Sequence, residues 1–348
     1  MKLLRIFSLK RTTIVILGLC ILYLILINIP ASSTSAQKEF QVFAQESISS
    51  IASRLEQEKL ILNKYLFISY LFLTGKANQI KAGVYDLNSK MSTKTIANIL
   101  IEGKEKLIKI TIPEGWNLRD IGFYLENLGL FQAEEFWEVA GFPATDYSKT
   151  TDLPRPLDFS DKFPFLKEKP KEVGLEGYLF PDTYFVPKTI TPEKLIELFL
   201  SNFQNKVYLS LQNQLKKSDK SLFEILTMAS LLEKEVKSME DKRIVSGILW
   251  KRLKVGMPLQ VDATITYLTN KKTTKIGGEV LEIDSKYNTY KYKGLPLGPI
   301  CNPGIESILA ALNPQESPYW YYLTTPDGVT IFSKTYQEHL LAKKKYLK

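Results

Sequence analysis

An uncharged stretch near the N-terminus constrains the architecture of this 348-residue chain more than any other feature. It reads TIVILGLCILYLILINI and runs from residue 13 to 29. A helix needs about 17–25 apolar residues to cross a bilayer, so these residues are just sufficient. Residues 1–12 hold four basic residues and no acid, a bias that predicts a cytoplasmic N-terminus. The basic residues are Lys2, Arg5, Lys10 and Arg11.

A cleaved signal peptide is the alternative interpretation of the same stretch. Its apolar region would span about 7–15 residues and end at a site of small residues. The stretch here is longer, and residues 31–33, Ala-Ser-Ser, match such a site only loosely. We therefore expect a transmembrane helix over 13–29 that contacts the lipid bilayer, a polar linker over 30–38, and the rest of the chain on the extracytoplasmic side.

The residue types available to this chain exclude several kinds of functional site. With one histidine and two cysteines, we expect no metal centre and no cofactor, and a Ser-His-Asp triad is disfavoured. The net charge of +9 is concentrated at the two ends, because residues 1–12 and residues 343–348 carry four basic residues each. The body between them is nearly neutral, so we expect no nucleic-acid partner. If the protein is an enzyme, we expect carboxylates to carry most of its chemistry.

Residues 39–135 alternate between strand and helix patterns. Three apolar residues at helical spacing recur 70 residues further along, and a strand-like run precedes each set (40–44 and 107–113). Between them, 81–87 predicts another strand and 93–100 another short helix. The recurring residues are Ile48, Ile51 and Leu55, then Leu118, Ile121 and Leu125. The pattern predicts a small α+β module, although such units are common in any α/β protein.

Residues 136–348 predict a mixed α+β domain, so that the whole chain falls in the α+β class. A long loop without periodicity spans 146–171, and loops of this length in compact domains are often functional. It leads into the aromatic-rich segment LEGYLFPDTYFVP, residues 175–187. Helical patterns cover 134–139, 191–211, 221–236, 241–253 and 305–312, and 319–325 predicts a late strand.

Glu176 is the first candidate for catalysis. Read as an extended segment, 175–187 places Glu176, Tyr178 and Tyr184 on one face, provided that Gly177 does not break the alternation. An acid among aromatic rings is poorly solvated, which raises its pKa and lets it donate a proton near neutral pH. The alternative is that Glu176 ends a turn and the rings belong to the core.

Glu233 is the second candidate acid. It falls inside the apolar arc of the helix that begins at the capping box formed by Ser221 and Glu224. A carboxylate on a buried face costs several kcal/mol unless it is paired, so Glu233 either has a structural partner or lines a pocket. Glu235 lies at the edge of the arc, and we expect it in solvent.

The segment MPLQVDATITYL, residues 257–268, is the third candidate. Gln260, Asp262 and Thr264 alternate with apolar residues, as in a half-buried strand. Such a polar face suits sugar hydroxyl and acetamide groups, and it equally suits plain exposure to solvent.

Five separated motifs occur in an order that resembles the bacterial endolytic murein transglycosylases (the MltG or YceG-like family). They are LEGYLFPDTYFVP, ASLLEKEV, MPLQVDATITY, GLPLGPICNPGIESILAALNP and YYLTTPDGVTIF. The resemblance extends from the uncharged stretch to about residue 340. It implies a single-pass protein of the bacterial cell (inner) membrane, with a LysM-like module over 39–135 and an extracytoplasmic catalytic domain over 136–348.

The resemblance also assigns roles to residues. It implies that Glu176 is the catalytic acid and that Glu233 lies in the same cleft. Cys301 occupies a position where the family suggests a small residue. The candidates for binding the sugars are Glu233, Tyr178, Tyr184, Gln260, Asp262, Thr264 and Asn302.

The implied substrate is the glycan strand of peptidoglycan, which a single acid can cut. The C6 hydroxyl of N-acetylmuramic acid attacks C1 in place of water, so Glu176 protonates the leaving oxygen and then accepts the hydroxyl's proton. The product is a 1,6-anhydro end. The resemblance alone implies endolytic cutting, termination of nascent strands and association with peptidoglycan synthases. A membrane-tethered scaffold that binds the wall without turnover and a muramidase that hydrolyses the same bond are the alternatives.

Overall fold

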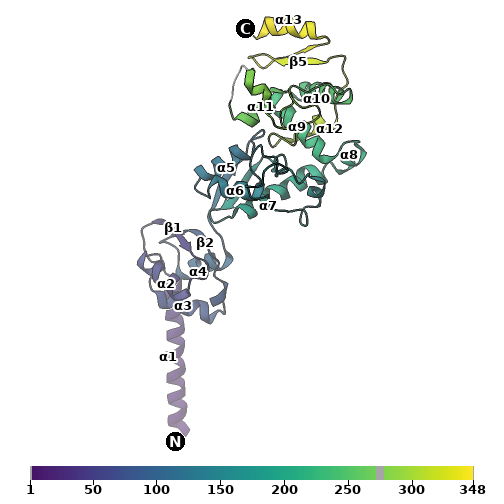
Figure 1. The fold of residues 1–348 in the computed structure, drawn as a ribbon. Coiled ribbons are helices and arrows are strands. Elements are labelled where there is room, and N and C mark those ends of the chain that lie inside the picture. The colour runs from purple at the N-terminus through teal and green to yellow at the C-terminus, as the bar shows by residue number, and fades with distance from the viewer. Residues whose placement is uncertain (1, 272–277, 348) are drawn as a thin grey trace. The chain divides into compact units, whose positions relative to one another are not determined.

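The computed structural model describes residues 2–271 and 278–347. They form two compact units that combine helices with short two-stranded sheets (Figure 1). The mixed α+β fold expected from the sequence is thus confirmed. The first unit comprises residues 1–109 and 185–189, and the second comprises residues 110–184 and 190–348.

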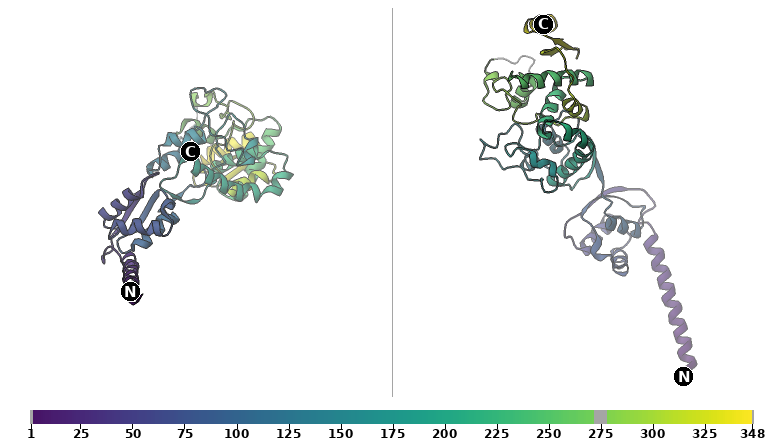
Figure 2. Two further views of the ribbon diagram at one scale, coloured as in Figure 1. Left: turned by 90° about the horizontal axis from the view of Figure 1, so that it is seen from below. Right: turned by 90° about the vertical axis from the view of Figure 1, so that its right-hand side faces the viewer.

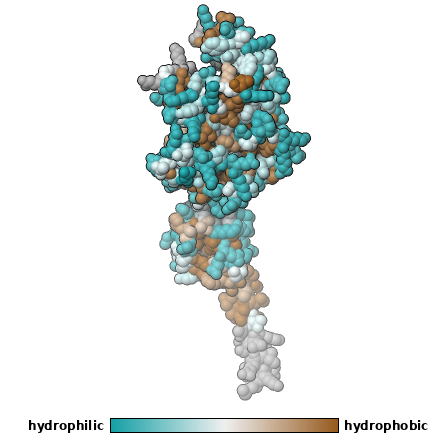
Figure 3. All heavy atoms as spheres, turned by 45° about the vertical axis from the view of Figure 1, so that its right-hand side comes forward, coloured by the Kyte–Doolittle hydropathy of each residue, from teal (hydrophilic) through white to brown (hydrophobic). Residues whose placement is uncertain are grey.

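Helix α1 (Lys2–Asn28) includes the basic segment and most of the uncharged stretch. Its apolar side chains between Ile14 and Ile25 are largely exposed, and apolar residues dominate the coloured part of this helix in Figure 3. Among the residues that the structure describes, no helix is both long and apolar enough to cross a bilayer. The transmembrane helix expected over 13–29 is therefore not supported by the structure, although a helix forms there.

Strands β1 (Gln37–Val42) and β2 (Gly83–Asn88) pair antiparallel in the first unit, with Phe40 opposite Tyr85. Helices gather around this pair (Figures 1 and 2), and their buried side chains form one apolar core with it. The helical elements are α2 (Ile48–Gln57), α3 (Lys64–Leu73), η1 (Ala77–Gln79) and α4 (Thr93–Glu102).

The secondary structure of the first unit largely follows the sequence pattern. β2 and α4 lie where a strand and a helix are predicted. The pattern misses α3, because KYLFISYLFL is apolar on nearly every side and shows no helical period. Asn63 still marks the start of this helix by accepting the Tyr65 N–H. The LysM-like assignment of this unit stays a prediction.

Strand β3 (Leu107–Thr111) pairs with β4 (Thr183–Pro187), and the helices α5 (Leu118–Asn127) and α6 (Ala133–Ala140) pack against each other. Both helices lie in the second unit, whereas the boundary drawn from the sequence at residue 135 assigns α5 to the first module. The physical reason is that α5 begins beside Glu176, which belongs to the second unit. The Leu118 N–H, in the first turn of α5, donates a hydrogen bond to the Glu176 carboxyl.

Helix α9 (Leu222–Glu235) is the most deeply buried helix of the second unit. It packs against α10 (Met239–Lys254), α11 (Asp262–Thr269) and α12 (Ile305–Leu312), which lie around it in Figure 1. The predicted capping box at Ser221 closes its first turn. The end of α9 therefore brings its two acids close to α11 and α12.

Further helical segments surround this core. Helix α7 (Pro192–Phe203) continues into a π-helical segment (Gln204–Leu209) and is followed by α8 (Gln212–Lys217). Two 3₁₀ segments, η2 (Pro164–Glu168) and η4 (Gly278–Glu282), lie within long loops.

The described chain ends in a small layer that covers one end of α9. Strands β5 (Tyr321–Thr324) and β6 (Thr330–Ser333) pair antiparallel. Helix α13 (Tyr336–Tyr346) packs against both strands, as the yellow elements of Figure 1 show. The late strand predicted over 319–325 is confirmed by β5.

The expected strand over residues 257–268 is wrong. The chain enters helix α11 at Asp262, and only its polar–apolar alternation resembled a strand. Gln260 takes a left-handed conformation with φ of 54°, which turns the backbone away from an extended path just before the helix. The Thr264 hydroxyl then donates to the Val261 carbonyl across the first turn.

The extended conformation expected for the whole of 175–187 is also wrong. The backbone turns at Leu175–Tyr178, where the Tyr178 N–H donates to the Leu175 carbonyl, and only β4 is extended. Gly177 has φ of 88°, and a Cβ at this position would lie 2.6 Å from Pro299. This position therefore requires glycine. The turn separates Glu176 from the face that carries Tyr184.

Candidate functional site

The Glu176 carboxyl lies in the interior of the second unit, and its residue is only 3% exposed. The Leu118 N–H and the Tyr267 hydroxyl both donate to Oε2, each at 3.0 Å. The Asn302 side-chain amide donates to Oε1, also at 3.0 Å. Segments far apart in the sequence thus converge on one carboxyl: the start of α5, the middle of α11 and the loop before α12.

Burial dominates the electrostatics of this carboxyl. It raises the pKa of Glu176 from 4.5 to about 8, while the hydrogen bonds from Leu118 and Tyr267 act in the opposite direction. The charged form is disfavoured because burial removes water from the carboxyl, and the hydrogen bonds and the charge of Arg119 compensate only in part. Glu176 therefore holds a proton at neutral pH. A protonated acid of this kind can serve as a general acid.

Asn302 is fully buried and fixes the turn that carries Glu176. Its Oδ1 accepts the N–H groups of Gly177 at 2.9 Å and Leu179 at 3.0 Å. Its Nδ2 donates to the Trp116 carbonyl as well as to Glu176. All four contacts require one orientation of the amide. The structure thus brings together two of the residues singled out in the sequence, Glu176 and Asn302.

Tyr267 is a residue of the site that sequence reasoning missed. Its hydroxyl accepts the Ala144 N–H at 3.0 Å and donates to Glu176. Burial raises its pKa well above 10, so the phenol keeps the proton that it donates. A helical interpretation of 262–269 would have found it, because Thr264 and Tyr267 then lie on one face at i, i+3 spacing.

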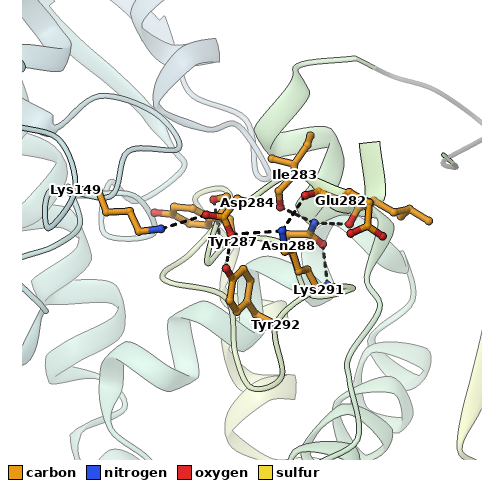
Figure 4. A network of polar contacts seen from close by, with 10 residues as sticks. Lys149, Glu282, Ile283, Asp284, Tyr287, Asn288, Lys291 and Tyr292 are labelled. Carbon is orange, nitrogen blue, oxygen red and sulfur yellow. Dashed lines mark hydrogen bonds and ion pairs between the residues drawn. The ribbon is translucent and has the colours of Figure 1, made fainter. Parts of the chain in front are cut away.

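The loop at 281–292 supports Tyr267 from the side. Tyr287 packs edge-on against the Tyr267 ring, with centroids 5.2 Å apart. Asn288 organises this loop, since its amide donates to the carbonyls of Leu281 and Ile283 (Figure 4). The loop therefore holds a tyrosine against the partner of Glu176.

Asp284 ties the same loop to its surroundings. It accepts the Tyr292 hydroxyl and forms ion pairs with Lys149 at 3.7 Å and Lys291 at 3.5 Å, as the dashed lines of Figure 4 show. These charges are partly exposed, so each pair contributes little alone. Together with the hydrogen bonds of Asn288, these contacts hold the part of the loop that carries Tyr287.

The sequence left two interpretations for Glu233: it is held by structural partners, or it lines a pocket. The structure shows structural partners. It accepts the Gly304 N–H at 3.1 Å and the Ser307 hydroxyl at 2.5 Å, both at the start of α12. Lys242 lies 3.6 Å away, and both side chains are nearly buried. Glu233 thus joins α9, α10 and α12. A role in substrate binding stays a prediction.

Three of the predicted sugar-binding residues lie in the core. Tyr178 is buried between Phe165 and Phe203. The Tyr184 hydroxyl donates to the Phe180 carbonyl, and the Thr264 hydroxyl is engaged inside the protein. In this conformation, none of the three presents a polar group to a ligand.

Gln260 and Asp262 instead line an open cavity of about 430 Å³ at the end of α9. Glu235 lines it too, which corrects the expectation that this acid lies in solvent. Glu235 is half-buried and accepts hydrogen bonds from the Ala263 N–H and the Tyr322 hydroxyl. Burial, followed by the charge of Asp262, raises the pKa of Glu235 to about 7. Asp262 accepts the Tyr290 hydroxyl.

Cys301 has a simple structural environment. It is fully buried beside α9, and its Sγ lies 3.4 Å from the Ser230 carbonyl. Burial raises the pKa of its thiol well above 9, so it stays protonated. It is a packing residue, and buried thiols of this kind are inert.

Comparisons with known proteins agree on one family. Residues 40–345 match the model of the YceG-like family. The chain is 34% identical over 334 residues to an endolytic murein transglycosylase of Bacillus subtilis, covering 92% of this chain and 84% of that protein. It is 30% identical over 313 residues to an endolytic murein transglycosylase of Streptococcus pneumoniae, covering 84% of this chain and 55% of that protein. The crystal structure of a yceG-like protein from Listeria monocytogenes has a TM-score of 0.58 and 31% identity, covering 89% of this chain and all of that one.

Proposed function

The chain belongs to the YceG-like family, and from this premise we propose that it is a lytic transglycosylase of peptidoglycan. It cuts the bond between N-acetylmuramic acid and N-acetylglucosamine inside glycan strands and leaves 1,6-anhydro ends. The observation that carries the proposal is the single acid Glu176, held in the protein interior by Leu118, Tyr267 and Asn302. Because its pKa is raised to about 8, the carboxyl of Glu176 is protonated at neutral pH and can give its proton to the leaving oxygen.

The reaction uses this one carboxyl twice. Glu176 first gives its proton to the glycosidic oxygen as the bond to C1 of the muramic sugar breaks. The carboxylate then takes the proton of the sugar's C6 hydroxyl, whose oxygen forms the new bond to C1. Water is not consumed and no second carboxylate is required. Since the nucleophile belongs to the substrate, the position of the sugar supplies much of the rate.

Glu176 must reach the substrate from an enclosed position. The partner best placed to give way is the Tyr267 hydroxyl, since Leu118 and Asn302 bind through groups that also define the backbone of α5 and the turn at Gly177. We propose that substrate binding displaces Tyr267, which leaves the Leu118 N–H as the one remaining donor to Oε2 among those described and opens that oxygen to the substrate. The Ala144 N–H is the group that this motion leaves without its acceptor.

Mass spectrometry of the released glycan fragments tests the proposed function. The full-length protein in detergent is incubated with purified glycan strands. We expect the released fragments to carry 1,6-anhydro ends. Reducing ends identify a muramidase, and no release identifies a scaffold that binds the wall without turnover; either result contradicts the proposal.

We further propose that the protein is attached to the cell membrane by residues 13–29, with the second unit outside the cytoplasm. The support is the uncharged sequence and the four basic residues before it. Attachment would place the enzyme beside peptidoglycan synthases, where cutting ends a growing strand. Membrane fractionation tests this: recovery of the full-length protein in the soluble fraction contradicts it, as does failure of added protease to reach the second unit in spheroplasts.

A further inference from the structure

We propose that a cavity formed by the long loop at 146–171 binds the carboxylate end of a short peptide, of the kind that the muramic sugars of peptidoglycan carry. The identity of this ligand rests on the proposed function, which makes a peptide-bearing strand the substrate. The cavity has a volume of about 510 Å³, within the range of sites for small ligands. Among the residues that the structure describes, it shares no lining residue with the cavity at the end of α9.

The walls of this cavity are held in place by the end of helix α6. The Leu157 N–H donates to the Val139 carbonyl at 3.0 Å, and the Leu175 N–H donates to the Ala140 carbonyl at 2.7 Å. The backbones also approach closely, since a Cβ at Gly174 would lie 2.6 Å from the Ala140 carbonyl oxygen. Because the loop is already fixed, a ligand does not have to order it, and little binding free energy is lost in doing so.

Positive charge dominates the lining of the cavity. The described residues that line it include four cations and one carboxylate: Arg155, Lys167, Lys169 and Lys171, and Asp158. Two other lysines of the same loop form ion pairs with acids of other segments. Within the part of the chain that the structure describes, none of the four lining cations forms such an ion pair. The excess positive charge therefore favours an anionic ligand.

Lys169 is the cation best placed to bind the anion. It is half-buried, and its Nζ donates to the Val173 carbonyl at 2.7 Å and to the Pro170 carbonyl at 3.1 Å. Two of its three donors are thus engaged within the described chain, and the third remains for a ligand. Burial lowers the pKa of Lys169 from 10.5 to about 8, although the charges of Asp158 and Glu172 act in the opposite direction. A bound carboxylate would further favour the charged ammonium.

Arg155 provides a second, planar donor. Its Nη2 donates to the Tyr147 carbonyl at 3.1 Å, and Tyr147 is itself buried, with a hydroxyl that accepts the Phe142 N–H. This contact holds one side of the guanidinium and leaves its other N–H groups for the cavity that Arg155 lines. A guanidinium fixed in this way suits the two oxygens of a carboxylate.

The rest of the lining favours a peptide carboxylate over a phosphate. Leu157, Phe159 and Leu166 supply apolar surface between the cations, which suits small apolar side chains of a peptide. Asp158 accepts the Ser160 N–H at 2.8 Å and also lines the cavity. Its carboxylate repels a doubly charged phosphate, whereas it can accept a hydrogen bond from a peptide N–H.

The cavity adjoins the turn that carries the proposed catalytic acid. Leu175 lines the cavity and directly precedes Glu176, so their Cα atoms are about 3.8 Å apart. The Leu175 carbonyl also accepts the Tyr178 N–H within this turn. A peptide bound in the cavity is therefore anchored beside the acid, where it can help to position the sugar to which it is attached.

Binding of a small peptide to the full-length protein in detergent tests the inference. The probes are N-acetyl-D-alanyl-D-alanine and its C-terminal amide, with affinity measured by calorimetry. We expect the wild type to bind the acid about tenfold more tightly than the amide, because the amide lacks the charge. Combining Lys167→Gln with Lys171→Gln, both at exposed positions, is expected to weaken binding of the acid about fivefold. Lys194→Gln, at an exposed lysine of α7 outside the cavity, is the control and leaves binding unchanged.

Cutting assays with two kinds of strand test the role of the cavity in substrate recognition. The double lysine variant is expected to raise KM on peptide-bearing strands with kcat nearly unchanged, and to leave KM on peptide-free strands as it is. An equal rise on both kinds of strand overturns the inference, because the peptide is then not what the cavity recognises.

The binding outcomes separate this inference from the proposed function. If the wild type binds the acid and the amide equally, or if the double variant binds the acid as the wild type does, the inference is overturned. It is also overturned if inorganic phosphate displaces the peptide and binds more tightly than it. If the wild type releases no fragments but binds the acid in a way that the double variant weakens, the carboxylate site stands and the proposed function falls.

Discussion

The second unit places two acids of raised pKa in different surroundings. Glu176 is enclosed, and three donors fix its carboxyl. Glu235 lines an open cavity whose opposite wall carries tyrosines and a histidine. Burial raises the pKa in both cases, to about 8 and about 7. The difference teaches that a raised pKa alone does not distinguish a proton donor from a group that binds the ligand. The two acids differ instead in how many donors fix the carboxyl and in how open the carboxyl is to a ligand.

The largest expected effect is a loss of activity on substitution of the enclosed acid, Glu176. Glu176→Gln removes the transferable proton, and we expect cutting to fall by about 10²–10⁴-fold. The release of fragments from glycan strands measures it. Glu134→Gln is the control, since Glu134 is exposed on α6. Unchanged cutting by a folded Glu176→Gln variant contradicts the catalytic assignment.

The pH dependence of stability sharpens the same comparison. Between pH 4.5 and about 8 the unfolded Glu176 has lost its proton while the folded form keeps it, so stability decreases as pH rises through this window. The decrease is on the order of 5 kcal/mol. Thermal unfolding at several pH values measures it, and Glu176→Gln removes most of the slope. A wild-type stability that rises with pH over this window shows that the carboxyl is not held protonated. Glu235→Gln removes a smaller part of the slope.

Asn302→Ala tests whether the enclosure depends on one amide. The substitution leaves the N–H groups of Gly177 and Leu179 unpaired inside the protein. We expect the free energy of unfolding to fall by about 3 kcal/mol, measured by urea denaturation. Asn313→Ala, at an exposed asparagine, is expected to cost well under that. Equal losses for the two variants contradict the supporting role of Asn302.

The smallest expected effect compares two tyrosines, one that binds Glu176 and one that binds Asp262 in the open cavity. Tyr267→Phe removes a hydrogen bond that stabilises the Glu176 carboxylate, so the pKa of Glu176 rises and the alkaline limb of the activity profile moves to higher pH. We expect a loss of stability of about 1–2 kcal/mol. Tyr290→Phe removes the partner of Asp262 and leaves this limb in place. If both variants shift the alkaline limb of the activity profile equally, then the pKa of Glu176 does not determine the position of that limb.

Much of the fold follows from local signals, while the site depends on packing between distant segments. The capping box at Ser221 and the apolar period of α12 mark helices that the structure confirms. The contact between Glu176 and Leu118 joins residues 58 positions apart, and no periodicity records it. Gly177 and Gln260, with positive φ, end two patterns that otherwise suggest strands.

The raised pKa of Glu176 is the central physical claim, and NMR measures it most directly. The carboxyl carbons of ¹³C-labelled glutamate are followed through a pH titration, and Glu176→Gln assigns the signal. The account predicts a midpoint for Glu176 of about 8 in the free protein. A midpoint near the ordinary value of 4.5 contradicts it, because the carboxyl would then be ionised at neutral pH and have no proton to give.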